Sequence, residues 1–428
     1  MGTILLVGLG VLFLVNLPIA FALGASSTLA MLIQGNVPLM IIPQRMFASV
    51  DSFPLMAIPF FVLAGNLMGD GGISRRLIDF VSSIMGRVTG GLAIVTVATC
   101  MFFAAISGSS AATAAAIGTL LIPAMVQRKY ELNFAAATVA ASGELGVIIP
   151  PSIPMVLYGV MASQSIGTIF LAGFIPGILI AGSLMLTAYV IAKKKGFVGT
   201  EKSSIKEIGA SFKEALLALL MPVIILGGIY GGIFTPTEAA VVAVFYGGFV
   251  GLFIYREIKI TDLKKIFLES TLTTSTIMII IANASTFGWI MTREQIPIKI
   301  AEVFMSASGG NPLLFLFHVN ILLLLIGTMF ETSASIIILT PLLLPVALQL
   351  GIDPIHFGMI IIVNLAVGMV TPPLGINLFV TCNIAKTSIE DLTRYLFPYL
   401  LVLIADIFII TYIPQISLWL PRVLGALK

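Results

Sequence analysis

Residues 143–153 decide the fold of this chain, because two adjacent prolines interrupt an apolar segment there. The segment reads GELGVIIPPSI. Pro150 and Pro151 lack an N–H group and disfavour a helical residue before them, and Gly146 loosens the chain one turn earlier. We therefore predict a broken helix whose carbonyls at residues 146–149 lose their helical partners and form a cation site. The half-helix that begins near Ser152 would offer N–H groups to an anion. A simple proline kink is the competing interpretation.

A second copy of this break lies 222 residues further along the chain. Residues 368–377 read GMVTPPLGIN, and the same ungapped shift places four of the five prolines of residues 88–176 on prolines. The matched pairs are Pro123 with Pro345, Pro150 with Pro372, Pro151 with Pro373 and Pro176 with Pro398. Coincidence in a proline-bearing chain is the alternative to an internal repeat.

Each break is preceded by a stretch rich in small and hydroxyl residues. Residues 105–113 read AISGSSAAT, and residues 327–335 read GTMFETSAS. Arg87 and Arg128 flank the first stretch and both indicate the cytoplasmic side, so the stretch should be the tip of a re-entrant hairpin. Non-helical backbone at membrane depth is tolerated only where protein buries it or water reaches it. Close packing of helices through small residues is the alternative.

Composition places the chain in a membrane. The 428 residues include 22 Lys and Arg against 19 Asp and Glu, a net charge of +3, and 59% are hydrophobic. Only 10% are charged, whereas a soluble domain has about 25%. We predict a polytopic α-helical protein with the lipid bilayer as its partner, and no nucleic-acid binding, because no basic stripe exists. Long apolar runs predict spans at 4–23, 25–42, 53–69, 168–192, 215–233, 237–255, 268–291 and 396–420.

No motif indicates an enzyme. Cys100 and Cys382 form no disulfide framework, and the chain has no HExxH motif and no Walker A lysine. An intramembrane enzyme would need a nucleophile beside a base, or an acidic metal pair, and the sequence offers neither arrangement.

The charged flanks of the two interrupted regions differ. Arg75, Arg76, Arg87 and Arg128 surround the first region, whereas residues 350–357, inside the second, contain no Lys or Arg. Because basic flanks stay in the cytoplasm, the first region should enter from the cytoplasm and its copy from outside. An inverted-topology repeat of this kind is typical of secondary transporters.

The chain resembles the DctM/SiaM-like large membrane subunit of tripartite ATP-independent periplasmic (TRAP) transporters. The resemblance runs from about residue 4 to 425 and rests on residues 52–68 (SFPLMAIPFFVLAGNLM), 103–118 (FAAISGSSAATAAAIG), 143–153, 172–177 (AGFIPG) and 232–240 (GIFTPTEAA). It implies a separate large subunit rather than a fused one, located in the bacterial inner membrane. It also implies sodium coupling, a small four-helix membrane subunit and a periplasmic binding protein that delivers a small organic anion, such as sialic acid or a C4-dicarboxylate.

The fold that the resemblance implies is an all-α polytopic elevator-type transporter with an inverted repeat, two re-entrant hairpins and two broken helices. The mobile transport domain would comprise residues 86–166 and 308–390. Residues 1–85, 167–307 and 391–428 would form the scaffold, with a basic cytoplasmic linker at 193–213.

The resemblance also implies two sodium sites. The first would use Ser107, Ser110, Gly146, Ile149 and Pro151, and the second Gly327, Thr332, Gly368, Thr371 and Pro373. The second tip departs from the first, because Glu331 and Thr332 stand where the first has Ser109 and Ser110.

The expected substrate contacts are polar residues at or beside the two breaks, namely Ser109, Ser152, Asn364, Asn377 and Glu144. Two alternatives stay open. Glu144 could instead pair with a hydroxyl group, and the two asparagines could brace the loop. A stand-alone dicarboxylate carrier that needs no binding protein is the alternative function.

The inverted repeat makes a direct prediction about topology. In a variant without Cys100 and Cys382, single cysteines at Ser83 and Gly351 should react with an impermeant thiol reagent from opposite sides of the membrane, because the two hairpins enter from opposite sides. Labelling of both positions from the same side would exclude the inverted repeat.

Overall fold

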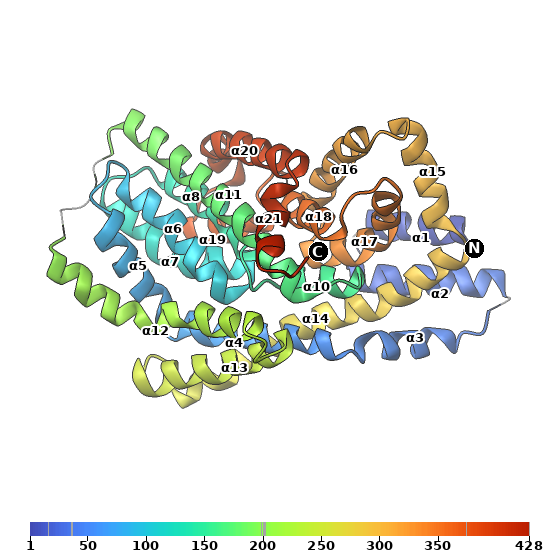
Figure 1. Cartoon of the computed structure of the whole chain (residues 1–428), viewed down its shortest axis with the longest axis horizontal. Coiled ribbons are helices and arrows are strands. Elements are labelled where there is room, and N and C mark those ends of the chain that lie inside the picture. The colour runs from blue at the N-terminus through green and yellow to red at the C-terminus, as the bar shows by residue number, and fades with distance from the viewer. Residues whose placement is uncertain (16, 36, 198, 200–202, 374, 428) are drawn as a thin grey trace.

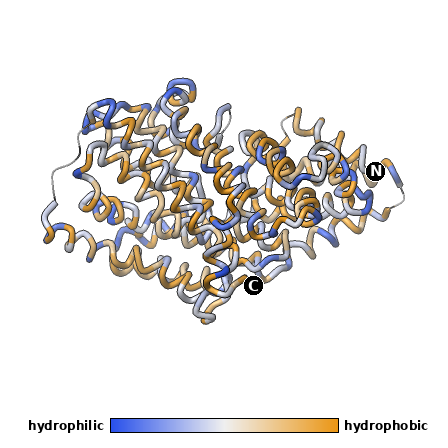
Figure 2. The backbone as a smooth tube through the Cα atoms, turned by 45° about the horizontal axis from the view of Figure 1, so that its top comes forward, coloured by the Kyte–Doolittle hydropathy of each residue, from blue (hydrophilic) through white to orange (hydrophobic). Residues whose placement is uncertain are grey.

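The chain forms α-helices throughout the described part of the computed structural model, which comprises all residues except 16, 36, 198, 200–202, 374 and 428. Helices satisfy every backbone polar group within one segment, as a bilayer requires. Eight of them are long and apolar enough to cross a membrane. Hydrophobic residues run along most helices, and hydrophilic residues lie mainly at helix ends and turns (Figure 2). The predicted class, a polytopic helical membrane protein, is confirmed.

The two predicted hairpins are present at the predicted spacing. The first consists of α6 (Gly91–Ser107) and α7 (Ser110–Gln127), and the second of α16 (Pro312–Gly327) and α17 (Thr332–Gln349). Adding 222 to both bounds of α7 gives both bounds of α17. The internal repeat is therefore a structural repeat and not a coincidence of prolines.

A broken helix follows each hairpin. In the first repeat, α8 (Leu132–Gly143) and α9 (Leu145–Ile148) are followed by α10 (Ile153–Met161) at an angle of 41°. In the second, α18 (Pro354–Gly368) is followed by α19 (Ile376–Ala385). Both Pro-Pro peptide bonds are cis. The prolines thus break a helix in each repeat, as the sequence predicts.

The two repeats are interlocked. The second leg of each hairpin packs against the second half-helix of the other repeat, α7 on α19 and α17 on α10, as well as against its own broken helix. The long helices α11 (Ile166–Lys195) and α20 (Ile389–Tyr412) complete the repeats and contact each other. They carry Pro176 and Pro398, the last matched proline pair.

Contacts at the ends of α8 and α11 join these helices to α20. Glu131 accepts hydrogen bonds from Lys195 at 2.7 and 2.8 Å and from the Tyr395 hydroxyl. These bonds hold the pKa of the Glu131 carboxyl below its usual range. Further along, the hydroxyl groups of Thr138 and Tyr399 lie 2.9 Å apart.

Among the remaining helices, α3, α4, α12, α13 and α14 lie along the lower side of Figure 1. There α14 packs against α2, α3 and α4, and α13 packs against α4 and α12, whereas α21 packs against α11 and α15 against α17. The bounds are α1 (Gly2–Leu14), α2 (Ile19–Gln34), α3 (Ile41–Val50), η1 (Phe53–Met56), α4 (Ala57–Asp70), α5 (Ile73–Met85), α12 (Ile205–Tyr230), α13 (Pro236–Phe249), η2 (Val250–Ile254), α14 (Ile260–Arg293), α15 (Ile296–Ser308) and α21 (Gln415–Val423).

Four sequence-predicted boundaries are wrong. The run at 25–42 is not one helix, because α2 ends at Gln34 and α3 begins at Ile41. The run at 4–23 is divided because α1 ends at Leu14 and α2 begins after Pro18, which cannot continue a helix from α1. The run at 396–420 is divided at Pro414, between α20 and α21. The linker at 193–213 is shorter than predicted, because α11 extends to Lys195 and α12 begins at Ile205. Residues 198 and 200–202 of that linker lie outside the described residues.

Glycines bring each hairpin tip against the break of its own repeat. A Cβ atom on Gly146 would lie 2.3 Å from the Ser109 carbonyl oxygen. A Cβ atom on Gly368 would lie 2.4 Å from the Gly327 Cα atom. Both distances are far below van der Waals contact, so the two tips reach the two breaks only because these residues have no side chain.

We expect Gly368→Ala to destabilise the protein by roughly 1–3 kcal/mol, the usual cost of overpacking a tight interior. The added methyl group meets backbone atoms of Gly327, which cannot move without shifting the hairpin. The matched control is Gly227→Ala in α12, where no atom lies within 4 Å of the new Cβ. Thermal unfolding of the purified variants should show a lower Tm for Gly368→Ala alone. Equal melting of the two variants would contradict the close approach.

Candidate functional site

The first hairpin tip is a network of hydroxyl groups and one carbonyl. The hydroxyl oxygens of Ser107 and Thr113 lie 2.7 Å apart, and the Thr113 hydroxyl donates to the Ser109 carbonyl at 2.8 Å. Ser109 is the N-cap of α7, and its side chain accepts from the Ala112 amide. The network places several neutral oxygen atoms at the end of two helices.

This tip lies directly on the first break. The Ile153 amide donates to the Gly108 carbonyl at 3.3 Å, and a Cβ atom on Gly108 would lie 3.0 Å from the Pro151 carbonyl oxygen. The structure therefore brings Gly108 beside Pro151 and Ser109 beside Gly146. One amide of α10 is already used by the tip, so this half-helix offers fewer N–H groups to an anion than the sequence suggested.

The prolines leave fewer carbonyls without a partner than predicted, since the sequence suggested that all carbonyls of residues 146–149 would lose their helical partners. Pro150 and Pro151 occupy the positions whose amides would pair with the carbonyls of Gly146 and Val147. The Val147 carbonyl is recaptured by the Ser152 hydroxyl at 2.6 Å. The Gly146 carbonyl accepts no hydrogen bond from position 150, because proline has no N–H group. Ile149 is the extended residue that follows α9. Ser152 therefore caps the broken end of α9.

Asn377 connects the first tip to the second repeat. Ser110 donates its hydroxyl hydrogen to the Asn377 side-chain oxygen at 2.8 Å, and the Asn377 side-chain amide donates to the Ala140 carbonyl at 3.4 Å. The Asn377 backbone amide also donates to the Met369 carbonyl at 3.1 Å. Asn377 is fully buried. It thus braces the second break against the first tip and α8, which is one of the two roles that the sequence left open.

The second tip has different chemistry. Glu331 is the N-cap of α17, and its carboxylate accepts from the Ser333 amide and hydroxyl, each at 2.8 Å, and from the Ala334 amide. The Thr332 hydroxyl faces the Met369 sulfur atom at 2.9 Å. The hydroxyl donates its hydrogen to this weak acceptor, and donation leaves its two lone pairs unused.

Gly327, Thr332 and Gly368 are brought together at this tip, but Thr371 is used differently. Its hydroxyl donates to the Val367 carbonyl at 2.7 Å, within the end of α18. Pro373 lies in the turn that follows. The next residue of the break, Leu374, lies outside the described residues.

Two predicted substrate contacts make no hydrogen bond to either tip in the described residues. The Asn364 amide donates to the Asn320 side chain at 2.9 Å and to the Ile360 carbonyl, inside a fully buried contact between α18 and α16. Glu144 is also fully buried, and within the described residues neither of its carboxylate oxygens has a hydrogen-bond partner. The expected pairing of Glu144 with a hydroxyl group is therefore not found.

Thr113 and Met369 were not assigned by sequence reasoning. Thr113 was visible as a hydroxyl residue one turn into α7, on the face that carries Ser109. The position of Met369 had no such signal, because its contact with Thr332 depends on the approach of the second hairpin to α18.

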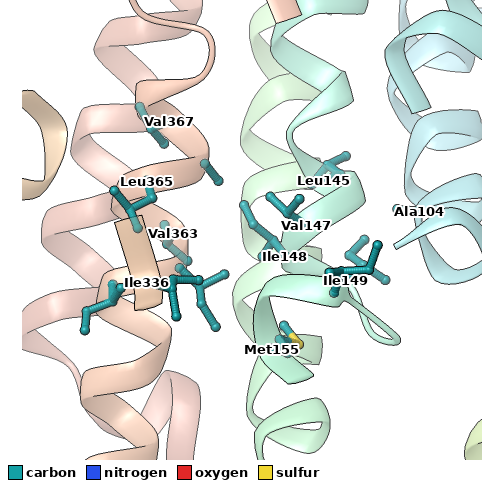
Figure 3. Close-up of a cluster of buried hydrophobic side chains, with 14 of the residues drawn as sticks. Ala104, Leu145, Val147, Ile148, Ile149, Met155, Ile336, Val363, Leu365 and Val367 are labelled. Carbon is teal, nitrogen blue, oxygen red and sulfur yellow. The ribbon is translucent and has the colours of Figure 1, made fainter. Parts of the chain in front are cut away.

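An apolar layer separates the two breaks. In Figure 3, Val147, Ile148 and Ile149 of the first break lie opposite Val363, Leu365 and Val367 of α18, and these side chains are buried. Within the described residues, no group of three or more His, Cys, Asp or Glu side chains is placed to hold a metal ion. The oxygen atoms at the first tip are hydroxyl and carbonyl oxygens.

A family model described as the DctM component of tripartite ATP-independent periplasmic transporters matches residues 6–416. The chain is 46% identical to an isethionate TRAP transporter permease of Oleidesulfovibrio alaskensis over 97% of its own length, but it spans only 65% of that relative. It is 45% identical to the C4-dicarboxylate large permease of Pseudomonas aeruginosa, over 94% of each chain. It is 40% identical to the sialic acid large permease of Vibrio cholerae, over 97% and 96% of the two chains.

Among solved structures, the YdaH transporter of Alcanivorax borkumensis matches with a TM-score of 0.62 over 87% of this chain and 86% of that one. Because the sequence identity is only 14%, this likeness concerns the fold alone. The broken-helix repeat, the family match along nearly the whole chain and the sequence relatives agree: this chain belongs to the DctM component family of tripartite ATP-independent periplasmic transporters.

Proposed function

We propose that this chain is the large membrane subunit of a sodium-coupled importer for a small organic anion. The observation that carries this proposal is the pairing of each hairpin tip with the break of its own repeat. Paired broken helices at corresponding positions in two repeats are where secondary transporters bind substrate and coupling ions.

The first tip suits a hard monovalent cation. Such ions prefer oxygen ligands, and Ser107, Ser110 and the Gly146 carbonyl supply them from three separate segments. Ser110 donates its hydrogen to Asn377, so its lone pairs face away from that bond and are available to a cation. A sodium ion would hold the tip against the break by neutralising the carbonyl dipoles collected there.

The second tip offers a smaller set of ligands. Thr332 keeps a hydroxyl oxygen free, and the Gly327 carbonyl lies 2.9 Å from the position of a Cβ on Gly368. Thr371 donates its hydrogen to Val367 and still has lone pairs. We therefore propose a second sodium site built on Gly327, Thr332 and Thr371.

The relatives suggest the class of substrate and the partners. Their names include isethionate, C4-dicarboxylate and sialic acid transport, and all of these substrates are small organic acids. We propose a substrate of this class, delivered by a periplasmic binding protein, and an assembly with the small four-helix subunit in the bacterial inner membrane.

The proposed moving part contains both hairpins and both broken helices, residues 86–166 and 308–390. The packing of α11 and α20 on both repeats, with the contacts of Glu131 and Thr138, favours adding these two helices to it. An elevator movement of this unit along α4, α5 and α14 would carry the tips between the two membrane faces.

Ser110→Ala should weaken sodium binding. The change removes one hydroxyl oxygen and costs about 1–3 kcal/mol if that oxygen is a ligand, or roughly tenfold in the sodium concentration for half-maximal uptake. Thr332→Val tests the second site in the same way. Uptake should be measured against sodium concentration in proteoliposomes that hold the complete complex.

The matched control is Ser142→Ala, another buried serine, which donates only to the Thr138 carbonyl at 2.6 Å within α8. It should leave the sodium dependence unchanged. Unchanged sodium dependence in the double variant Ser110→Ala with Thr332→Val would mean that the tips serve packing only.

Transport should depend on the partners. Purified chain in liposomes should take up substrate only together with the small subunit, a sodium gradient and the loaded binding protein. Robust uptake by this chain alone would instead support the stand-alone carrier.

A further inference from the structure

A cavity of about 490 Å³ lies between helices α4 and α5 on one side and the first hairpin on the other. One wall belongs to α7 and is formed by Ala112, Ala115, Ala116, Thr119 and Leu120. The opposite wall, from α4 and α5, is polar and includes Asn66, Asp70, Ser74 and Arg75. The volume is in the range of small-molecule sites.

The cavity begins at the first tip and extends toward the basic flank of the hairpin. Gly65 lines it, and a Cβ atom on Gly65 would lie 3.1 Å from the Ser107 carbonyl oxygen. Arg75 lines it as well and belongs to the flank that should face the cytoplasm. A substrate that leaves the first tip for the cytoplasm would meet this cavity first.

One buried hydroxyl in the cavity lacks a partner. Ser74 is 4% exposed, and within the described residues its hydroxyl oxygen makes no hydrogen bond. A buried polar group without a partner needs an explanation, and a polar ligand would supply one. Asn66 donates its side-chain amide to the Ser270 hydroxyl at 2.8 Å, so its carbonyl oxygen remains an acceptor.

The charges of the cavity have both signs. In the described part of the chain, Arg75 has no carboxylate within the 4.0 Å of a salt bridge, although Asp79 acts on it at longer range. Asp70 also has no salt bridge there, and Lys265 approaches it only at longer range. Glu257, a third charged residue of the lining, is paired with Arg76 at 3.4 Å. Both side chains are exposed, so one guanidinium and one carboxylate at the edge of the cavity are open to a ligand.

We propose that this cavity is a release-side binding site for a small acid that also carries a hydroxyl or ammonium group. Arg75 binds the acid group through charge-assisted hydrogen bonds. Asp70 and the Asn66 oxygen accept hydrogen bonds from the hydroxyl or ammonium group, and Ser74 completes the contact. A plain dicarboxylate is disfavoured, because its second carboxylate would face Asp70. This inference rests on the proposed transport function and narrows its substrate class.

Direct binding of ligands to the membrane complex tests the proposal, because the periplasmic binding protein is absent and its specificity cannot affect the result. The purified complex of this chain with the small subunit is titrated calorimetrically with isethionate, a hydroxylated sulfonate, and with succinate, at saturating sodium. Isethionate should bind more tightly than succinate. Arg75→Gln should weaken isethionate binding by roughly tenfold, the usual loss for a hydrogen bond to a charged group. Asp70→Asn should weaken isethionate and strengthen succinate.

The matched control is Arg87→Gln, which removes a basic residue of the same flank outside the cavity and should change neither affinity. A second measurement uses Ala115→Cys on the α7 wall, whose labelling from the cytoplasmic side should be slowed by isethionate and not by succinate. Equal affinity for the two acids with no change in Asp70→Asn would overturn the release site, as would the absence of isethionate binding. If sodium-driven uptake by the tripartite system persists in that case, only this inference fails. If the wild-type tripartite system shows no sodium-driven uptake, the proposed function itself is contradicted.

Discussion

The close approach of each hairpin tip to its break is the contact on which the rest of the structure depends. Gly146 and Gly368 let the backbone of one segment touch the backbone of another. A tip held at a larger distance could not place its hydroxyl groups beside carbonyls that the prolines have released. The glycines therefore set the geometry, and at the first break the prolines leave the Gly146 carbonyl without its helical partner.

The second constraint is the interlocking of the two repeats. Each hairpin packs on a half-helix of the other repeat, and Asn377 bonds to Ser110, to the Ala140 carbonyl and to the Met369 carbonyl. A displacement of the first tip would therefore pull on Asn377, which is hydrogen-bonded to the second break. If sodium binds at Ser110 as proposed, this connection gives a physical route between the two sites, because the ion would act on a residue that is anchored in both repeats.

The repeats are symmetric in backbone and asymmetric in chemistry. The bounds of α7 and α17 match under one shift, yet the N-cap of α7 is a serine and that of α17 is a glutamate. Glu331 uses its carboxylate to cap its own helix, whereas the first tip holds its hydroxyls in a network with Thr113. The polar cavity beside the first tip adds to this difference, because Asp70 and Arg75 line it from α4 and α5.

The sequence by itself determined the membrane class, the repeat, the two hairpins, the two breaks and the family, because prolines, glycines and apolar runs act on the chain locally. It also selected the residues of the first tip correctly as neighbours of the break. Only the tertiary structure decided what those residues do. Ser152 caps a broken helix and Asn377 braces two repeats, because each role depends on a partner that another part of the chain supplies. The partners of Asn364 and Glu144 depend on helix packing in the same way: Asn364 bonds to Asn320 of α16, and Glu144 has no hydrogen-bond partner among the described residues.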